Sequence, residues 1–318
     1  MAEGRLPVEM LTGVELHLTK IALFLKALLY SLTNNQELVE LLGHITGGNV
    51  RQVIELVTKF IGSPNVDADK IIGIMEQEGQ YTVPVHEFSK HALLGEYSHY
   101  SPDSSLAMNI FDVRFPDRRE HFLSPMLVAY LHHDGPHRNR EGFVTSSQIE
   151  EEMQSWGFTV PQIENALRRA TNKKLIETTE RITFEEDMTG LVGDMPMAFR
   201  VTTIGAYHLL RWAPSFAYLD AMVFDTPIFD SKRTEAMQHA LNSLDIKDRY
   251  DRACEFRSYL SESWAMADLS PAYFDWSSLA KHGDGSFEMV ARVVRSGPRA
   301  IRKGGDGRRR RAARGSRR

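Results

Sequence analysis

A pair of glycines between two helical stretches is the feature that most constrains how this sequence can fold. Residues 36–45 and 50–61 each carry apolar side chains at the three- and four-residue spacing of an amphipathic helix. Gly47 suits the left-handed position that ends a helix, and Asn49 can accept hydrogen bonds from the open amides of the next helix. The pattern predicts a tight corner, with Arg51 in the first turn of the second helix.

Arg51 and the helix start beside it together favour an anion. Free amide groups and the helix dipole both attract negative charge, so a phosphate placed here meets amide hydrogens and a guanidinium at once. The same residues also fit an ordinary capped corner with a solvated arginine. Taken alone, the corner leaves both interpretations open.

The run Gly-Gly-Asn-Val-Arg-Gln at residues 47–52, followed by an apolar helix, resembles the sensor-2 corner in the helical lid of AAA+ ATPases. The closest resemblance is to replication-initiator-like prokaryotic members. It implies that Arg51, with Asn49 beside it, contacts the γ-phosphate of ATP bound on a separate αβα domain. The resemblance continues over residues 88–100, 109–112 and 121–230.

The motifs with which that family holds ATP are missing. The sequence has no Gly-x-x-x-x-Gly-Lys-Ser/Thr loop and no apolar strand ending in a paired Asp-Glu for magnesium. We therefore expect no enzyme activity from this chain alone, and ATP only together with a P-loop ATPase domain or subunit supplied elsewhere. Either the chain is the C-terminal piece of a longer ATPase, or the ATPase half is a separate polypeptide, or the activity has been lost.

No catalytic residue and no metal site is predicted. His86 and His91 are five residues apart, so on a helix they diverge instead of sharing the face that two metal ligands need. No arrangement of a nucleophile with a base, or of two paired carboxylates, stands out elsewhere in the sequence.

Between residues 118 and 214 the pattern predicts a winged helix. The expected elements are three helices, the two strands of a small β-wing and a last helix, at residues 121–132, 148–156, 159–174, 175–184, 199–202 and 204–212. A glycine-rich hairpin through Gly190 and Gly193 joins the two strands. In AAA+ initiators, which this chain resembles, such a domain follows the lid and binds DNA.

The helix over residues 159–174 is the predicted recognition helix. Its outward side is expected to carry side chains that hydrogen-bond base edges or phosphates, namely Gln162, Asn165, Arg169, Asn172 and Lys173. Charge argues against DNA, because residues 150–200 contain six bases and ten acids, which repel phosphates. DNA and protein therefore remain alternative ligands of this domain.

The charge of the chain changes sign near its C-terminus. Residues 291–318 contain twelve Lys and Arg against one acid, whereas residues 1–290 contain 26 bases and 41 acids. A segment of this composition cannot bury a core and is expected to be disordered. It could bind nucleic acid in a salt-dependent way, be an inert solvated tail, or come from a shifted reading frame.

Composition also indicates the cellular compartment of the protein. The most apolar run, residues 16–32, is interrupted by Lys20 and Lys26, so no membrane span is predicted. No signal peptide is visible, and a single cysteine, Cys254, fits a reducing compartment. We expect a cytoplasmic protein that does not insert into membranes.

The sequence thus predicts a mainly α chain in five parts. They are a helical lid-like bundle, a connecting segment, a winged helix with a small β-wing, a helical C-terminal appendage and a disordered Arg-rich tail, at residues 1–80, 81–117, 118–214, 215–290 and 291–318. The leading hypothesis is a regulator that couples nucleotide state on a P-loop domain to DNA binding. The alternative is a nucleotide-independent winged-helix module that binds protein, and an oligomeric state is left open.

Overall fold

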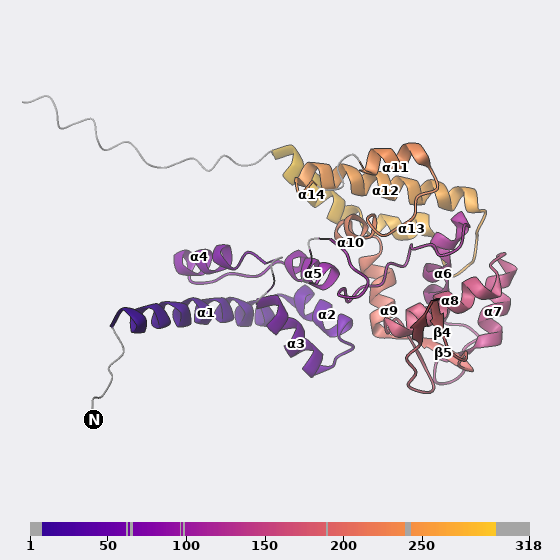
Figure 1. Ribbon diagram of the computed structural model, residues 1–318, viewed down its shortest axis with the longest axis horizontal. Coiled ribbons are helices and arrows are strands. Elements are labelled where there is room, and N and C mark those ends of the chain that lie inside the picture. Colours follow the sequence, from indigo (N-terminus) through magenta and orange to yellow (C-terminus); the bar gives the residue numbers. More distant parts are fainter. Residues whose placement is uncertain are drawn as a thin grey trace, which may run out of the picture.

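Helices dominate the parts of the chain that the computed structural model describes, which are residues 8–61, 63, 66–95, 97, 99–188, 190–238 and 243–296. This confirms the mainly α class. Figure 1 shows an N-terminal group of helices, a central region with the short strands, and a C-terminal group of helices. Over these described ranges, no helix combines the length and apolarity needed to cross a membrane.

The N-terminal bundle contains five helices, α1 (Val8–Asn34), α2 (Gln36–Ile45), α3 (Val50–Ile61), α4 (Ala68–Glu78) and α5 (Val85–Leu94). α4 lies along α1, while α2 and α3 pack on α5 (Figure 1). At its centre Phe60 of α3 stacks on Phe88 of α5, with ring centroids 3.7 Å apart. Because α5 supplies half of this contact, the bundle extends beyond the predicted boundary at residue 80.

A buried serine ties α1 to the segment that leads into α5. The Ser31 hydroxyl donates to the carbonyl of Ala27, 2.6 Å away, and accepts from the amide of Val83, 2.8 Å away. The Ser31 hydroxyl and the Val83 amide thereby both have hydrogen-bond partners inside an apolar core, where an unpaired polar group would destabilise the fold. This contact fixes the direction in which the chain enters α5.

The central region follows a helix–strand–helix–helix–strand order. Its elements are η1 (Arg118–Phe122), α6 (Leu123–His132), β1 (Val144–Thr145), α7 (Ser146–Ser155), α8 (Val160–Asn172), β2 (Ile176–Thr178), β3 (Glu185–Asp187), β4 (Gly190–Val192) and β5 (Ala198–Val201). β5 lies between β1 and β2 in an antiparallel sheet, with Val144 opposite Phe199 and Ile176 opposite Val201. β3 and β4 form a separate hairpin.

The predicted helices and the strand predicted over residues 199–202 agree with these elements to within a few residues, but the other predicted strand does not. The strand expected over residues 175–184 ends at Thr178, since beyond it β3 pairs only with β4 and leaves the sheet. The two-residue strand β1 was not predicted, because two residues show no alternation of apolar and polar side chains. The helix expected over residues 204–212 is a short α9 (Thr203–Tyr207) that widens into the π-helical turn η2 (His208–Trp212).

Both ends of α8 are fixed by local chemistry. At its start, Thr159 and Gln162 form a reciprocal cap, in which the Thr159 amide donates to the Gln162 side-chain oxygen over 2.9 Å. At its end Lys174 takes a left-handed conformation, with φ of 59°, and the next amide, that of Leu175, returns to the carbonyl of Ala170 over 2.8 Å. The chain then turns sharply into β2.

The C-terminal helices are α10 (Phe216–Met222), α11 (Ser231–Gln238), α12 (Ile246–Ala267), α13 (Trp276–Lys281) and α14 (Asp284–Ser296). α12 is the longest and contacts the other four and η1 (Figure 1). The disorder expected from residue 291 is not found up to Ser296, because α14, which is anchored by buried Phe287 and Ala291, continues to that residue. The rest of the predicted tail, residues 297–318, lies outside the described residues.

Residues 107–112 belong to the core and are not a linker between domains. Tyr218 donates its hydroxyl hydrogen to the carbonyl of Met108 and accepts from the amide of Ile110, at 2.5 and 3.0 Å. Nε2 of His208, in η2, accepts from the amide of Met108 over 3.1 Å. The connecting segment expected over residues 81–117 therefore joins the central region to the C-terminal helices.

Two buried histidines should make the protein less stable in mild acid. Burial lowers the pKa of His208 to about 3 and that of His121 to about 4, whereas an unfolded histidine titrates near 6.5. As the pH falls below 6.5 the unfolded chain takes up these protons first. The stability that the neutral rings contribute is complete above that pH and is lost progressively towards pH 3.

We expect the free energy of unfolding to fall by about 2 kcal/mol per histidine between pH 7 and pH 5. Urea titrations followed by circular dichroism measure it. His208→Gln should be less stable than the parent chain at pH 7 but should show a smaller change between the two pH values. An unchanged slope in that variant would contradict the assignment of a neutral His208.

Candidate functional site

The glycine corner between α2 and α3 has the predicted geometry. Gly47 and Gly48 both have left-handed φ angles, of 59° and 74°, and the amide of Gly48 closes the end of α2 by donating to the carbonyl of Gly43 over 2.8 Å. The side-chain oxygen of Asn49 accepts from the amide of Gln52 over 3.3 Å. The predicted cap by Asn49 is thus confirmed, and this side chain is occupied by the helix start.

Arg51 points to solvent from the first turn of α3. Its side chain is exposed and forms no ion pair or hydrogen bond within the described part of the chain. Its neighbours Val50 and Ile54 are also exposed, at 70% and 61%. The corner therefore presents a cation without an internal partner beside two apolar side chains.

On its other side the corner rests on α9. The ring of His44, near the end of α2, stacks on Tyr207, with centroids 5.2 Å apart and planes 17° apart. A Cβ atom at Gly47 would lie 3.9 Å from the Cδ1 atom of Ile204. Burial is the main reason why the pKa of Tyr207 is raised to about 12. The corner is thus in contact with the helix that follows the three-stranded sheet.

The predicted recognition side of α8 is covered by the chain itself. Arg169 forms an ion pair with Asp112, 2.7 Å away, and Asp112 is only 5% exposed. The ammonium of Lys173 donates to the carbonyls of Pro102 and Ser105, the latter at 3.0 Å. Burial lowers the pKa of both cations. Residues 101–112 thus occupy the place where a ligand of α8 was expected.

Two of the other side chains of α8 that were predicted to contact a ligand also have partners within the chain. Gln162 is buried in the cap described above. Asn172 binds the backbone of Phe184, donating to its carbonyl over 2.9 Å and accepting from its amide over 2.8 Å. Only Asn165, half-buried next to Gly190 of the hairpin, has no side-chain bond within the described residues.

The expectation that all five side chains face outward was therefore wrong for Gln162, Arg169, Asn172 and Lys173. Helical spacing identifies one side of α8 but does not show that residues 101–112, more than 45 residues earlier in the chain, return to cover it. A role of these residues in DNA binding stays a prediction. The hairpin beside them is acidic, because β3 consists of exposed Glu185, Glu186 and Asp187.

Sequence reasoning missed a buried charge cluster on α10 and α12. Asp220 accepts from Nε and Nη2 of Arg249, at 2.9 and 2.5 Å, and from Nη2 of Arg252, at 3.0 Å. The available signal was Asp220 itself, a single acid between Leu219 and Ala221 in an otherwise apolar helix. A charge in that position needs a buried partner.

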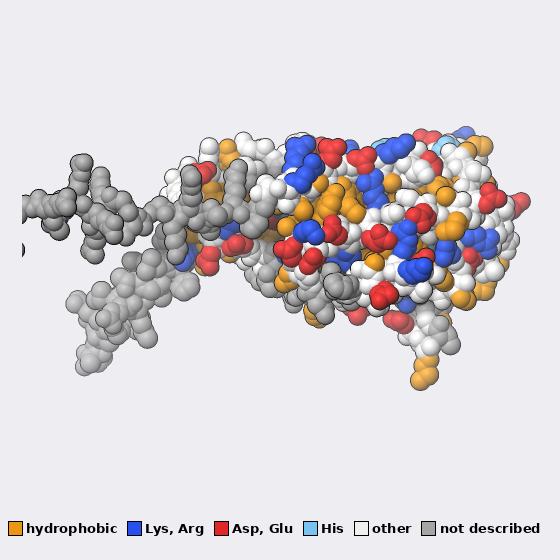
Figure 2. All heavy atoms as spheres, turned by 90° about the horizontal axis from the view of Figure 1, so that it is seen from above, with side chains coloured by type: hydrophobic (Ala, Val, Ile, Leu, Met, Phe, Trp, Pro, Cys, Tyr) orange, Lys and Arg blue, Asp and Glu red, His pale blue; other side chains and the backbone are white. Residues whose placement is uncertain are grey.

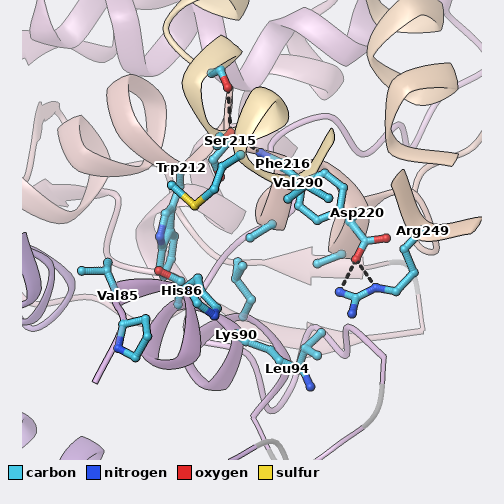
Figure 3. A pocket seen from close by; sticks show the side chains of 18 of the residues that line it. Val85, His86, Lys90, Leu94, Trp212, Ser215, Phe216, Asp220, Arg249 and Val290 are labelled. Carbon is cyan, nitrogen blue, oxygen red and sulfur yellow. Dashed lines mark hydrogen bonds and ion pairs between the residues drawn. The ribbon is translucent and has the colours of Figure 1, made fainter. Parts of the chain in front are cut away.

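This cluster lies at one side of a large cavity. The cavity has a volume of about 1160 Å³, and α2, α5, η2, α10, α12 and α14 all contribute to its walls (Figure 3). It therefore lies where the N-terminal bundle meets the C-terminal helices. In the described part of the chain no group of three His, Cys, Asp or Glu side chains is placed to hold a metal ion.

Comparison with known proteins provides no relative from which a role could be transferred, since no family model, no curated protein and no solved structure matches the chain.

Removing the carboxylate that holds Arg169 should destabilise the central region. Asp112→Asn keeps the shape of the side chain but leaves a largely buried guanidinium with a neutral partner, which should cost about 3 kcal/mol. Glu177→Gln is the matched control, because the Glu177–Arg200 pair is about half exposed and its loss should cost less than about 1 kcal/mol. Urea denaturation of the three chains measures the difference, and equal losses would show that the Asp112 contact is not a structural pair.

Proposed function

We propose that this chain is the lid and winged-helix part of a nucleotide-dependent regulator, with the nucleotide held on a P-loop domain supplied elsewhere. In this proposal Arg51 contacts the terminal phosphate. The observation that carries it is the exposed guanidinium in the first turn of α3, which has no partner in the described residues and lies at a helix start that favours anions.

The surroundings of Arg51 support a docking face. Val50 and Ile54 flank it on α3, and Ile21, Leu25 and Leu29 are exposed along one side of α1, each one helical turn from the next. Rows of exposed apolar side chains are typical of surfaces that another domain covers. A second domain could thus dock on the bundle and bring its nucleotide to Arg51.

Contacts between the corner and the central region support coupling. α2 meets α9 through His44 and Tyr207, and α9 lies tightly against the end of α8, since a Cβ atom at Gly205 would lie 2.0 Å from the carbonyl oxygen of Leu175. Packed elements in close contact move together more readily than they deform. A shift of the corner could therefore be transmitted to α8 through α9.

The order of elements in the central region supports a winged helix. α6, β1, α7, α8 and β2 are followed by a hairpin and by β5, which returns to the middle of the sheet. Its ligand in our proposal is a protein, because residues 101–112 cover α8 and the hairpin is acidic. On the face formed by the C-terminal helices, acidic and basic side chains are interspersed (Figure 2).

Arg51→Ala should weaken the distinction between ATP and ADP once the P-loop domain is present. A P-loop polypeptide encoded next to this chain, or in frame with it, is expressed together with it, and the affinities for ATP and ADP are measured. Loss of a charge-assisted contact to the terminal phosphate should lower the preference for ATP about ten- to a hundredfold. Lys59→Ala, at the exposed far end of α3, is the control and should change the preference less than twofold.

An unchanged preference in Arg51→Ala would contradict the sensor role. So would the absence of any P-loop polypeptide that assembles with this chain. In either case the nucleotide-independent protein-interaction module would be the better hypothesis.

If the protein binds duplex DNA, we expect most of the affinity to come from the C-terminal basic segment, residues 297–318. Residues 297–318 contain ten of the bases, and phosphate contacts of this kind produce a steep dependence of affinity on salt. Deleting them should remove most of the affinity and flatten its salt dependence in fluorescence anisotropy. A truncated chain that still binds duplex, and is weakened by Asn165→Ala, would instead identify the winged helix as a DNA reader.

A further inference from the structure

We propose that the cavity between the N-terminal bundle and the C-terminal helices binds a molecule with an apolar body and a terminal carboxylate, and that Lys90 is the partner of this carboxylate. This inference does not depend on the nucleotide-sensing proposal. It rests on the walls of the cavity and on the charges at one side of it.

The walls are apolar on several helices. Leu94 of α5, Trp212 of η2, Phe216 of α10 and Val290 of α14 line the cavity (Figure 3). Phe224, which follows α10, lines it as well. Most ligand sites combine such walls with a few polar groups that fix the orientation of the ligand. The volume of about 1160 Å³ is ample for an extended apolar chain or a small ring system.

Positively charged side chains outnumber carboxylates in the part of the cavity that contains Asp220. Asp220 is shared by Arg249 and Arg252, each within 3.0 Å of it, and Lys90 lines the same part of the cavity (Figure 3). Three positive groups therefore face one carboxylate whose two oxygens are already engaged. A second carboxylate at this position would complete the balance of charge.

Lys90 is the cation that lacks a partner. Its ammonium forms no ion pair or hydrogen bond within the described ranges, and the nearest acid on its own helix, Glu87, pairs with Lys70 at 3.5 Å. Burial lowers the pKa of Lys90 and repulsion by Arg249 lowers it further, and these two effects outweigh the attraction of Glu87 and Asp220, which act in the opposite direction. An anion placed beside it would relieve this repulsion and gain a charge-assisted hydrogen bond.

The part of the cavity around Tyr207 has a different balance of charge. There Glu37 and Glu40 of α2 and Arg211 of η2 surround Tyr207. Two acids against one base would repel a carboxylate. The cavity can therefore orient an amphipathic anion, with the charged group at Lys90 and the apolar body along the aromatic walls.

Calorimetric titration of the full chain tests this with three probes of one length, decanoate, decylamine and decanol. Decanoate should bind in one-to-one stoichiometry and at least tenfold more tightly than either of the others. Lys90→Met, which keeps an unbranched side chain of similar size without its charge, should weaken decanoate binding about ten- to a hundredfold and leave decanol binding unchanged. Lys90→Arg keeps the charge and should retain most of the affinity.

Lys59→Met, an exposed lysine outside the cavity, is the matched control and should bind decanoate like the parent chain. Unchanged decanol binding in Lys90→Met shows that this variant keeps the fold of the cavity. The proposal is overturned if decanoate binds no better than decylamine, or if Lys90→Met and Lys59→Met bind decanoate equally well. Loss of decanol binding in Lys90→Met together with full loss in Lys90→Arg would also overturn it, by showing a purely structural role.

Discussion

The hydrogen bonds that hold Met108 connect the parts of this molecule. The backbone of this buried residue is bound by His208 of η2 and by Tyr218 of α10, and Asn109 next to it donates to Thr226 over 2.9 Å. A buried polar group that lacks a hydrogen-bond partner destabilises the folded state, so the fold must bring each of these groups to its partner. The central region and the C-terminal helices are thus placed relative to one another by residues far apart in the sequence.

The same segment decides what α8 can do. Asp112 and the carbonyls of Pro102 and Ser105 take up Arg169 and Lys173, the two cations that most favoured a DNA-reading helix. These side chains therefore stabilise the fold of the chain. A helix covered in this way is better suited to packing or to protein contacts than to reading DNA, and the acidic hairpin beside it agrees with that role.

Local signals made the corner at residues 46–51 predictable, and long-range contacts made α8 unpredictable. Two left-handed glycines and the Asn49 cap depend only on neighbouring residues, so the sequence was sufficient to place Arg51. Helix positions followed in the same way from apolar spacing. The partners of Arg169, the short strand β1 and the pairing of Asp220 with Arg249 depend on which distant segments meet, and periodicity carries no such information.

The cavity draws its walls from α2 and α5 near the beginning of the chain and from α12 and α14 near the described end. A molecule bound in the cavity would contact both of these parts of the chain, and it would bind only the folded protein. At a concentration a hundred times its dissociation constant, such an occupant adds about 2.7 kcal/mol to the folded state. The stability of this protein would then depend on the concentration of the bound small molecule as well as on its own internal contacts.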